Sequence, residues 1–201
     1  SPGLVFAGLM GYEGHLVGIV DPGERRARVE AAFAPLLATR DLLERSGLPV
    51  AVVSGGGTGT YDVTGSYPGV TEVQAGSYVF MDAHYHPVRP EFRPSLSLLA
   101  TVVSRVKGAQ LITDAGLKAL STDMGLPQVL GVAGAQVSRL SEEHGRIELA
   151  DPAAVDLRPG DKVRLLPSHC CTTINLHDRL FAVRRDVVED VWPIAARGRS
   201  D

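Results

Sequence analysis

Two apolar runs on either side of one long helical segment constrain the fold of the N-terminal part of this chain. Residues 3–10 and 48–53 are nearly continuous apolar runs of strand length, as expected for strands buried on both faces of a parallel sheet. Residues 23–47 carry apolar side chains at helical spacing among many Arg and Glu, with Gly47 as the expected end and Pro35 as an expected kink or split. This strand, helix, strand order predicts a parallel barrel or a doubly wound sheet.

A third strand is expected over residues 70–82, and beyond it the pattern becomes that of a β domain. Strand-like segments separated by turns follow at residues 96–106, 109–112, 131–140, 146–149, 162–166 and 179–184. Because a (β/α)8 barrel takes about 250 residues, a chain of 201 residues can hold only the last part of one. We therefore expect an α/β plus all-β architecture, with the C-terminal part of a TIM-type barrel in residues 1–88 and a β domain in residues 89–201.

The composition excludes several classes of protein. The chain is 44% hydrophobic and 21% charged, as is ordinary for a globular protein, and its net charge of −3 offers no basic surface for nucleic acid. No apolar run approaches the roughly 20 residues of a membrane span, and the N-terminus lacks the plan of a signal peptide. The two cysteines are adjacent and form no ordinary disulfide with each other. We expect a cytoplasmic protein that binds neither membrane nor nucleic acid.

A glycine-rich loop, residues 54–60, directly follows the second predicted strand. Its four glycines, one serine and two threonines can converge N–H groups and hydroxyls on an anion, which predicts a phosphate cradle. A plain flexible turn rarely needs so many glycines, and the loop matches neither the Walker pattern nor the dinucleotide fingerprint. Tyr12, Glu13 and His15 follow the first predicted strand and are candidates by position. The alternative for these three residues is a strand end capped by satisfied polar groups.

The candidate metal ligands are His169 and Cys171. An extended chain would point these two side chains to one face and Cys170 to the other. An imidazole and a thiolate suit Zn²⁺, and two protein ligands leave positions open for water or a substrate oxygen. The alternative is a buried cysteine beside a hydrogen-bonded histidine. His84 and His86 also have strand spacing, but we expect them to be histidines of a boundary loop.

Six stretches along nearly the full chain carry a family resemblance: GLMGYEGH (8–15), VSGGGTGTYD (53–62), GVTEVQAGSYVFMD (69–82), DAGLKALSTD (114–123), PSHCCTTINL (167–176) and WPIAAR (192–197). In content and order they resemble the pyridoxal-phosphate (PLP) enzymes of the alanine-racemase-like fold, specifically the D-threonine aldolase and D-serine dehydratase group. The resemblance implies the last three strands of the barrel followed by the C-terminal β domain.

The resemblance also implies roles for particular residues. The phosphate of PLP would be held by the loop and by a second segment, at Gly56, Gly57, Thr58, Gly59, Thr60, Gly76 and Ser77. Tyr12 would lie at the pyridine ring near its nitrogen and would be a catalytic residue together with His169. His169 and Cys171 would bind a divalent metal, Zn²⁺ or Mn²⁺, which would act as a Lewis acid on the β-hydroxyl of the substrate.

Two reactions fit this arrangement. An aldolase breaks the Cα–Cβ bond of a D-3-hydroxy amino acid to give glycine and an aldehyde, whereas a dehydratase eliminates the hydroxyl to give a 2-oxo acid and ammonia. A cysteine at the second ligand position is more typical of the dehydratases. Residues 114–123 and the tail at Trp192 look more like the aldolases, so the aldolase reading is favoured. A hypothesis from another class is a non-catalytic PLP- or phosphate-binding protein with a vestigial metal pair.

The chain departs from the family in its lysines. The Schiff-base lysine of the family belongs at the end of the first barrel strand, and Lys107, Lys118 and Lys162 follow no such strand. We therefore expect the chain to be the C-terminal portion of a longer enzyme, with a missing N-terminal barrel segment that supplies this lysine. The expected partners are that segment, a second subunit in a homodimer, and a D-amino acid substrate.

Overall fold

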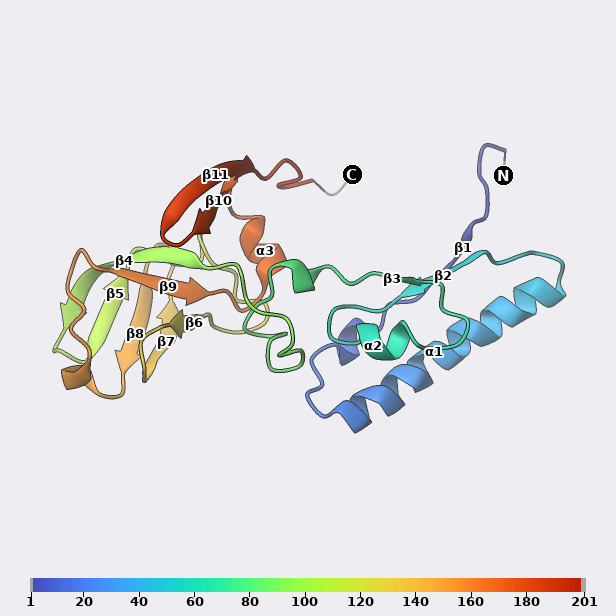
Figure 1. The fold of residues 1–201 in the computed structure, drawn as a ribbon, viewed down its shortest axis with the longest axis horizontal. Coiled ribbons are helices and arrows are strands. Elements are labelled where there is room, and N and C mark those ends of the chain that lie inside the picture. The colour runs from blue at the N-terminus through green and yellow to red at the C-terminus, as the bar shows by residue number, and fades with distance from the viewer. Residues whose placement is uncertain (1, 200–201) are drawn as a thin grey trace. The chain divides into compact units, whose positions relative to one another are not determined.

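The computed structural model describes residues 2–199, which divide into two compact units (Figure 1). The N-terminal unit runs to Val79 and also contains Tyr85–Arg93, and the C-terminal unit contains Phe80–His84 and the residues from Pro94 onward. Among the described residues, no helix combines the length and the apolar character that crossing a membrane requires.

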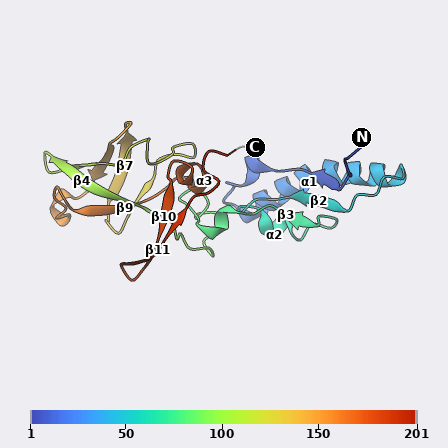
Figure 2. The ribbon, with the colours of Figure 1, turned by 90° about the horizontal axis from the view of Figure 1, so that it is seen from above.

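The N-terminal unit contains a parallel sheet in the order β1-β2-β3, and Figures 1 and 2 show α1 running alongside its strands. In chain order its elements are β1 (Gly8–Met10), a 3-10 helix (Gly14–Leu16), α1 (Pro22–Arg45), β2 (Val52–Gly55), α2 (Tyr61–Thr64), β3 (Glu72–Val73) and a second 3-10 helix (Ser77–Val79). The strands predicted over residues 3–10 and 70–82 are therefore too long. Each pairs with the central strand β2, which offers only four residues for pairing.

The helix α1 begins where the sequence supplies a cap. The Asp21 carboxylate accepts the N–H of Glu24 at 2.7 Å, and Pro22 occupies the first turn, where its missing N–H costs nothing. The helix continues through Pro35 to Arg45, so the split that we expected at Pro35 does not occur. The buried face of the helix contributes to an apolar cluster of four buried residues: Leu16, Val29, Phe33 and Val63.

The C-terminal unit contains a six-stranded antiparallel sheet in the order β6-β9-β4-β5-β8-β7. The strands are β4 (Leu98–Val106), β5 (Gln110–Thr113), β6 (Gln128–Leu130), β7 (Ala135–Leu140), β8 (Gly145–Leu149) and β9 (Lys162–Leu166). A 3-10 helix (Pro152–Ala154), α3 (Cys170–Ile174) and a separate hairpin of β10 (Arg179–Arg184) and β11 (Val187–Pro193) complete the unit. The strands predicted at 162–166 and 179–184 are confirmed at both ends, whereas β6 and β11 were not predicted.

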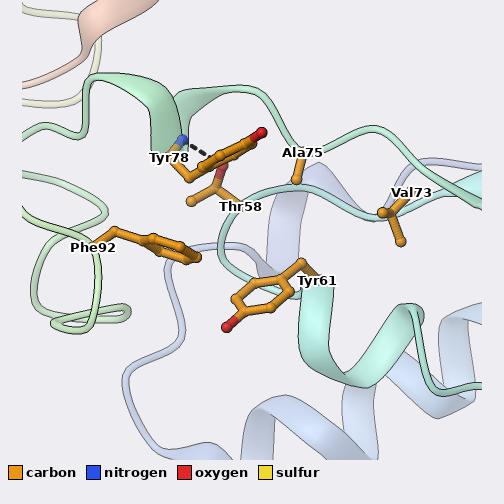
Figure 3. A pocket seen from close by; sticks show the side chains of 6 residues that line it. All are labelled: Thr58, Tyr61, Val73, Ala75, Tyr78 and Phe92. Atoms are coloured by element: carbon orange, nitrogen blue, oxygen red, sulfur yellow. Dashed lines mark hydrogen bonds between the residues drawn. The ribbon is translucent and has the colours of Figure 1, made fainter.

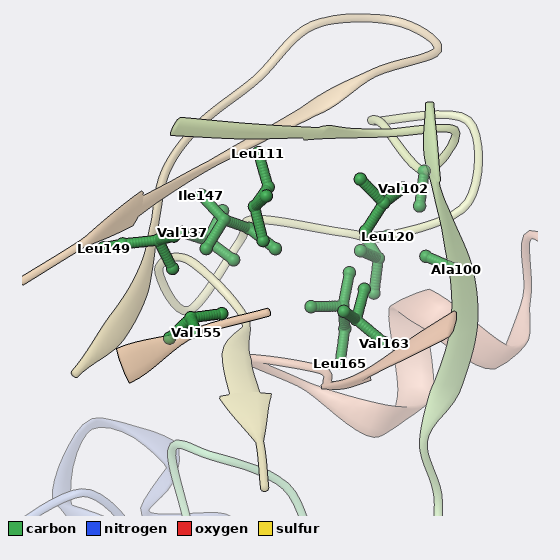
Figure 4. Close-up of a cluster of buried hydrophobic side chains, with 11 residues drawn as sticks. Ala100, Val102, Leu111, Leu120, Val137, Ile147, Leu149, Val155, Val163 and Leu165 are labelled. Carbon is green, nitrogen blue, oxygen red and sulfur yellow. The ribbon is translucent and has the colours of Figure 1, made fainter. Parts of the chain in front are cut away.

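The residues buried within the six-stranded sheet of the C-terminal unit form an apolar core. Eleven buried residues form one cluster (Figure 4), and Val102, Leu111, Leu120, Ile147 and Leu165 within it are completely buried. Burial of one large aliphatic side chain stabilises a fold by about 1.5–3 kcal/mol. The cluster therefore supplies the main stabilisation of the C-terminal unit.

The segment of residues 167–176, for which we considered an extended chain, instead contains α3, with His169 at the N-cap position. Contacts with a distant loop override the local pattern, since the N–H of Ser121 donates to the Thr173 hydroxyl at 3.2 Å. The argument that alternation places His169 and Cys171 on one face is therefore wrong. The two side chains meet because His169 adjoins the first turn of a helix that contains Cys171.

Candidate functional site

The predicted phosphate cradle is a tightly folded loop that follows β2. Gly56 has φ +77°, in the left-handed region that favours glycine. A Cβ atom built on Gly59 would lie 2.0 Å from the carbonyl oxygen of Val17, so no other residue fits that backbone. The glycines are therefore needed for the conformation of the loop and do not simply make it flexible.

Glu13 lies beneath this loop and is 3% exposed. Its Oε2 accepts the N–H of Gly56 at 3.1 Å, and its Oε1 accepts the hydroxyls of Thr60 at 2.5 Å and Thr64 at 2.9 Å. The Thr60 hydroxyl in turn accepts the N–H of Gly57 at 3.1 Å. Position in the sequence made Glu13 a candidate, and the structure shows that it holds the loop from within.

The hydrogen bonds of the loop decide which amides can face a ligand. Gly56 and Gly57 donate to Glu13 and Thr60, so these two N–H groups are occupied. Within residues 2–199, the N–H groups of Thr58 and Gly59 have no such partner. The Thr58 hydroxyl accepts the N–H of Tyr78 at 3.0 Å, which ties the loop to the segment that contains Gly76 and Ser77 (Figure 3). The two predicted phosphate-binding segments are therefore brought together.

Tyr12 borders the same loop. A Cβ atom built on Gly57 would lie 2.5 Å from the Tyr12 hydroxyl oxygen, so the ring lies directly against the loop backbone. Tyr12 is 49% exposed, which leaves much of its ring accessible. His15, the other candidate by position, is exposed on the 3-10 helix that follows.

An aromatic pocket of about 340 Å³ lies beside the loop (Figure 3). Its lining residues are Thr58, Tyr61, Val73, Ala75, Tyr78 and Phe92. The ring centroid of Phe92 lies 5.4 Å from that of Tyr61 and 5.5 Å from that of Tyr78. Sequence reasoning did not single out these three rings, because they come from separate segments and no spacing links them.

The predicted metal ligands lie together in the C-terminal unit. The ligand atoms of His169, Cys170 and Cys171 all lie within 4.8 Å of one another, and the two Sγ atoms are 3.9 Å apart. Cys170 is buried and Cys171 is exposed. The hydrogen bond with Cys171 and burial raise the pKa of the Cys170 thiol. Cys171, on the exposed side, is therefore the better placed of the two cysteines to bind a metal as thiolate.

A carboxylate that the sequence did not reveal completes this cluster. Asp82 is fully buried, its Oδ2 lies 2.9 Å from His169 Nδ1, and the same oxygen accepts the N–H of Cys170 at 3.0 Å. The hydrogen bond to Asp82, together with the bond to Cys171, raises the pKa of His169 to about 10. The sequence feature that could have pointed to Asp82 is its position as a single acidic residue at the end of the apolar run of residues 78–81.

Comparisons with known proteins show what this chain is similar to. A sequence-family profile described as "Putative serine dehydratase domain" matches residues 95–183. The 3-hydroxy-D-aspartate aldolase of Paracoccus denitrificans (strain Pd 1222) and the D-threonine aldolase of Arthrobacter sp are each 39% identical over 99% of this chain and 53% of their own length. The crystal structure of D-threonine aldolase from Filomicrobium marinum matches with a TM-score of 0.92 at 37% identity, over 98% of this chain and 54% of that one.

The chain thus spans about half the length of the curated relatives that it matches. The match to the second half of these proteins confirms the predicted fold class, the C-terminal part of an alanine-racemase-like barrel followed by a β domain. The chain belongs to the D-threonine aldolase and D-serine dehydratase group of the alanine-racemase-like fold.

Proposed function

We propose that this chain is part of a PLP- and divalent-metal-dependent lyase that cleaves D-3-hydroxy amino acids to glycine and an aldehyde. The observation that carries the proposal is the cluster of His169, Cys170 and Cys171 in a chain that aligns over 99% of its length with curated aldolases. The names of those relatives, D-threonine aldolase and 3-hydroxy-D-aspartate aldolase, support D-3-hydroxy amino acids as the proposed substrate class.

The glycine-rich loop fits a phosphate group. Two amides with no partner among the described residues, those of Thr58 and Gly59, lie beside the segment that contains Gly76 and Ser77, where a Cβ atom on Gly76 would meet nothing within 4 Å. When bound, PLP supplies an electron sink next to the α-carbon of an amino acid. We propose that its phosphate is held by these residues, that Tyr12 lies against the ring, and that Gly56, Gly57 and Thr60 shape the loop, because the hydroxyl of Thr60 donates to Glu13 and its N–H donates to Gly57.

The donor set of the cluster fits a divalent metal. Imidazole and thiolate suit Zn²⁺, and two ligands leave open positions, as a catalytic metal site requires. A bound divalent ion polarises an oxygen atom as a Lewis acid. We propose that His169 and Cys171 bind Zn²⁺ or Mn²⁺, while Cys170, whose raised pKa keeps it a thiol, packs in the interior.

A second candidate function is a D-serine dehydratase type of elimination, which gives a 2-oxo acid and ammonia. The observation in its favour is that residues 95–183, which include the metal cluster, match the serine dehydratase domain. A third candidate, a non-catalytic PLP- or phosphate-binding protein, would keep the loop and make no use of the cluster.

The lysines bear on how the enzyme is assembled. Lys107 lies in the turn between β4 and β5, Lys118 pairs with Glu143, and Lys162 donates to the Thr101 hydroxyl, so each belongs to the C-terminal unit. We propose that the lysine that anchors PLP comes from an N-terminal barrel segment, and that the working enzyme is a homodimer.

Product analysis of the enzyme with its N-terminal segment tests this function. With PLP and Mn²⁺, we expect glycine and acetaldehyde from D-threonine, no reaction with L-threonine, and loss of activity in EDTA that added Mn²⁺ restores. Pyruvate and ammonia from D-serine as the dominant products would favour the dehydratase. A PLP absorbance band without turnover of either substrate would contradict both enzymes and leave the binding protein.

A further inference from the structure

One buried oxygen atom contacts two parts of the metal cluster. Asp82 Oδ2 lies 2.9 Å from His169 Nδ1 and 3.0 Å from the backbone nitrogen of Cys170, and the Asp82 side chain is 0% exposed. Burial of a carboxylate is unfavourable unless hydrogen bonds satisfy it. The contacts of Asp82 are therefore the reason that a charged group is tolerated at this position.

The backbone around Asp82 is held in place. The N–H of Ala83 donates to the carbonyl oxygen of Pro167 at 2.9 Å, so the segment that contains Asp82 runs beside the segment that leads to His169. Met81, which is fully buried, has φ +54°, a left-handed conformation that L side chains rarely adopt. These constraints hold the carboxylate against the histidine ring.

We propose that Asp82 is a positioning residue for the metal site, because its contact with Nδ1 makes Nε2 the nitrogen of His169 that binds the metal. The inference rests on the proposed function, since it takes His169 and Cys171 as the ligands. A carboxylate that accepts the second N–H of a ligating histidine fixes the tautomer and the ring orientation, and it makes the ring a stronger ligand.

Zn²⁺ alone, titrated into the metal-free protein in competition with a fluorescent zinc chelator, is the first measurement. Asp82→Ala should weaken Zn²⁺ binding about 10- to 100-fold. Asp82→Asn can keep an oxygen in the position of Oδ2, removes the charge and replaces the other oxygen by an amide nitrogen, so its loss should be smaller, about three- to tenfold. Asp114→Asn is the matched control, because Asp114 accepts the N–H of Thr101 at 2.7 Å in the same unit and has no bond to His169.

Nitrogen NMR of the His169 ring is the second measurement, and a merely structural role would not change it. The unaltered protein should show the proton on Nδ1 and Zn²⁺ on Nε2, whereas Asp82→Ala should show a mixture of the two arrangements. If Asp82→Ala does not fold, the Zn²⁺ affinity of Asp82→Asn decides the question, because that variant can keep the acceptor and lacks the charge. A loss of about three- to tenfold supports the role of Asp82, and a loss within twofold overturns it.

The outcomes separate this inference from the proposed function. An unaltered protein that binds Zn²⁺, together with Asp82 variants that bind it within twofold and keep the Nδ1 tautomer, would overturn the role of Asp82 alone. An unaltered protein that binds no Zn²⁺ would overturn the proposed metal site, and the role of Asp82 with it.

Discussion

The two units of this chain have interiors of different kinds. The C-terminal unit encloses eleven buried apolar residues in one cluster within its antiparallel sheet, and its buried carboxylate, Asp82, lies outside that cluster, beside His169. The N-terminal unit has an apolar cluster of only four buried residues and also buries charged side chains, those of Glu13, Arg25 and Arg89. Apolar burial is non-directional, whereas each buried charge needs particular partners. The apolar interior of the C-terminal unit therefore stabilises its fold, whereas the buried charges of the N-terminal unit include Glu13, which fixes the conformation of the glycine-rich loop.

The largest effect should come from the apolar interior. Leu165→Ala removes a completely buried side chain from β9 and should lower the free energy of unfolding of the C-terminal unit by about 4 kcal/mol. Trp192, the single tryptophan, lies in that unit, so denaturant unfolding followed by its fluorescence measures the change. Leu99→Ala on the neighbouring strand is the control, because Leu99 is 64% exposed and should contribute less than about 0.5 kcal/mol.

Glu13→Ala should produce the next largest effect, and in the other unit. It removes the carboxylate to which three donors, the N–H of Gly56 and the hydroxyls of Thr60 and Thr64, are bound, and should cost about 3 kcal/mol. Thr64→Val removes one of these donors with little change of shape and should cost about 1 kcal/mol. Helix circular dichroism, which α1 dominates, measures unfolding of the N-terminal unit. If Glu13→Ala shifted the Trp192 transition equally, the two interiors would not be independent and the comparison would fail.

The same contrast explains how much of the fold could be predicted. In the C-terminal unit, alternation and turns predict strands well where one face packs on the shared apolar cluster; residues 162–166 match β9 in full, and Val163 and Leu165 belong to that cluster. Residues 179–184 match β10 in full, although β10 lies in a separate hairpin and contributes no residue to the cluster. In the N-terminal unit, the strands predicted over residues 3–10 and 70–82 are longer than β1 and β3, and residues 80–82 belong to the other unit. Pairing with β2 sets those lengths, and no local pattern encodes it.

The candidate site was predictable where residues are adjacent in sequence. Composition singles out the loop at Gly56–Thr60, and spacing singles out His169 and Cys171, although the extended geometry assumed for that pair is wrong. Asp82 was not predicted, because it lies 87 positions before the histidine that it contacts. The hydrogen-bond partners of Glu13 could not be predicted from the sequence either, because they depend on how β1 and β2 align.

A smaller effect is expected from the ion pair of the N-terminal unit. Arg89 is 6% exposed and donates to both oxygens of Asp62, which is 40% exposed. Burial alone would raise the pKa of Asp62, but the hydrogen bond and charge of Arg89 outweigh it, so this pKa lies below its ordinary value. Because solvent screens the pair, Asp62→Asn should cost about 1 kcal/mol at pH 7.

The pH dependence of that cost has a definite sign. Stabilisation by a carboxyl with a lowered pKa is complete above the unfolded value of about 4 and is lost as the pH falls through the folded value. The unaltered protein and Asp62→Asn should therefore converge in stability toward pH 2, measured by urea unfolding with helix circular dichroism. A difference that persisted unchanged in acid would show that Asp62 acts through its shape and not through its charge.

The smallest effect should come from an ion pair of similar chemistry on the surface of the same unit. Arg26 and Glu30 approach to 3.5 Å on α1, and their side chains are 56% and 45% exposed. Exposed pairs of this kind contribute about 0.5 kcal/mol or less, because water screens the charges and ordering two long side chains costs entropy. Glu30→Gln should therefore change the helix transition by less than about 0.5 kcal/mol, and added salt should reduce even that. If Glu30→Gln lowered the free energy of unfolding as much as Asp62→Asn, then the burial of Arg89 would not be the reason that its ion pair stabilises the unit. The contrast between buried and exposed charges in the N-terminal unit would then fail.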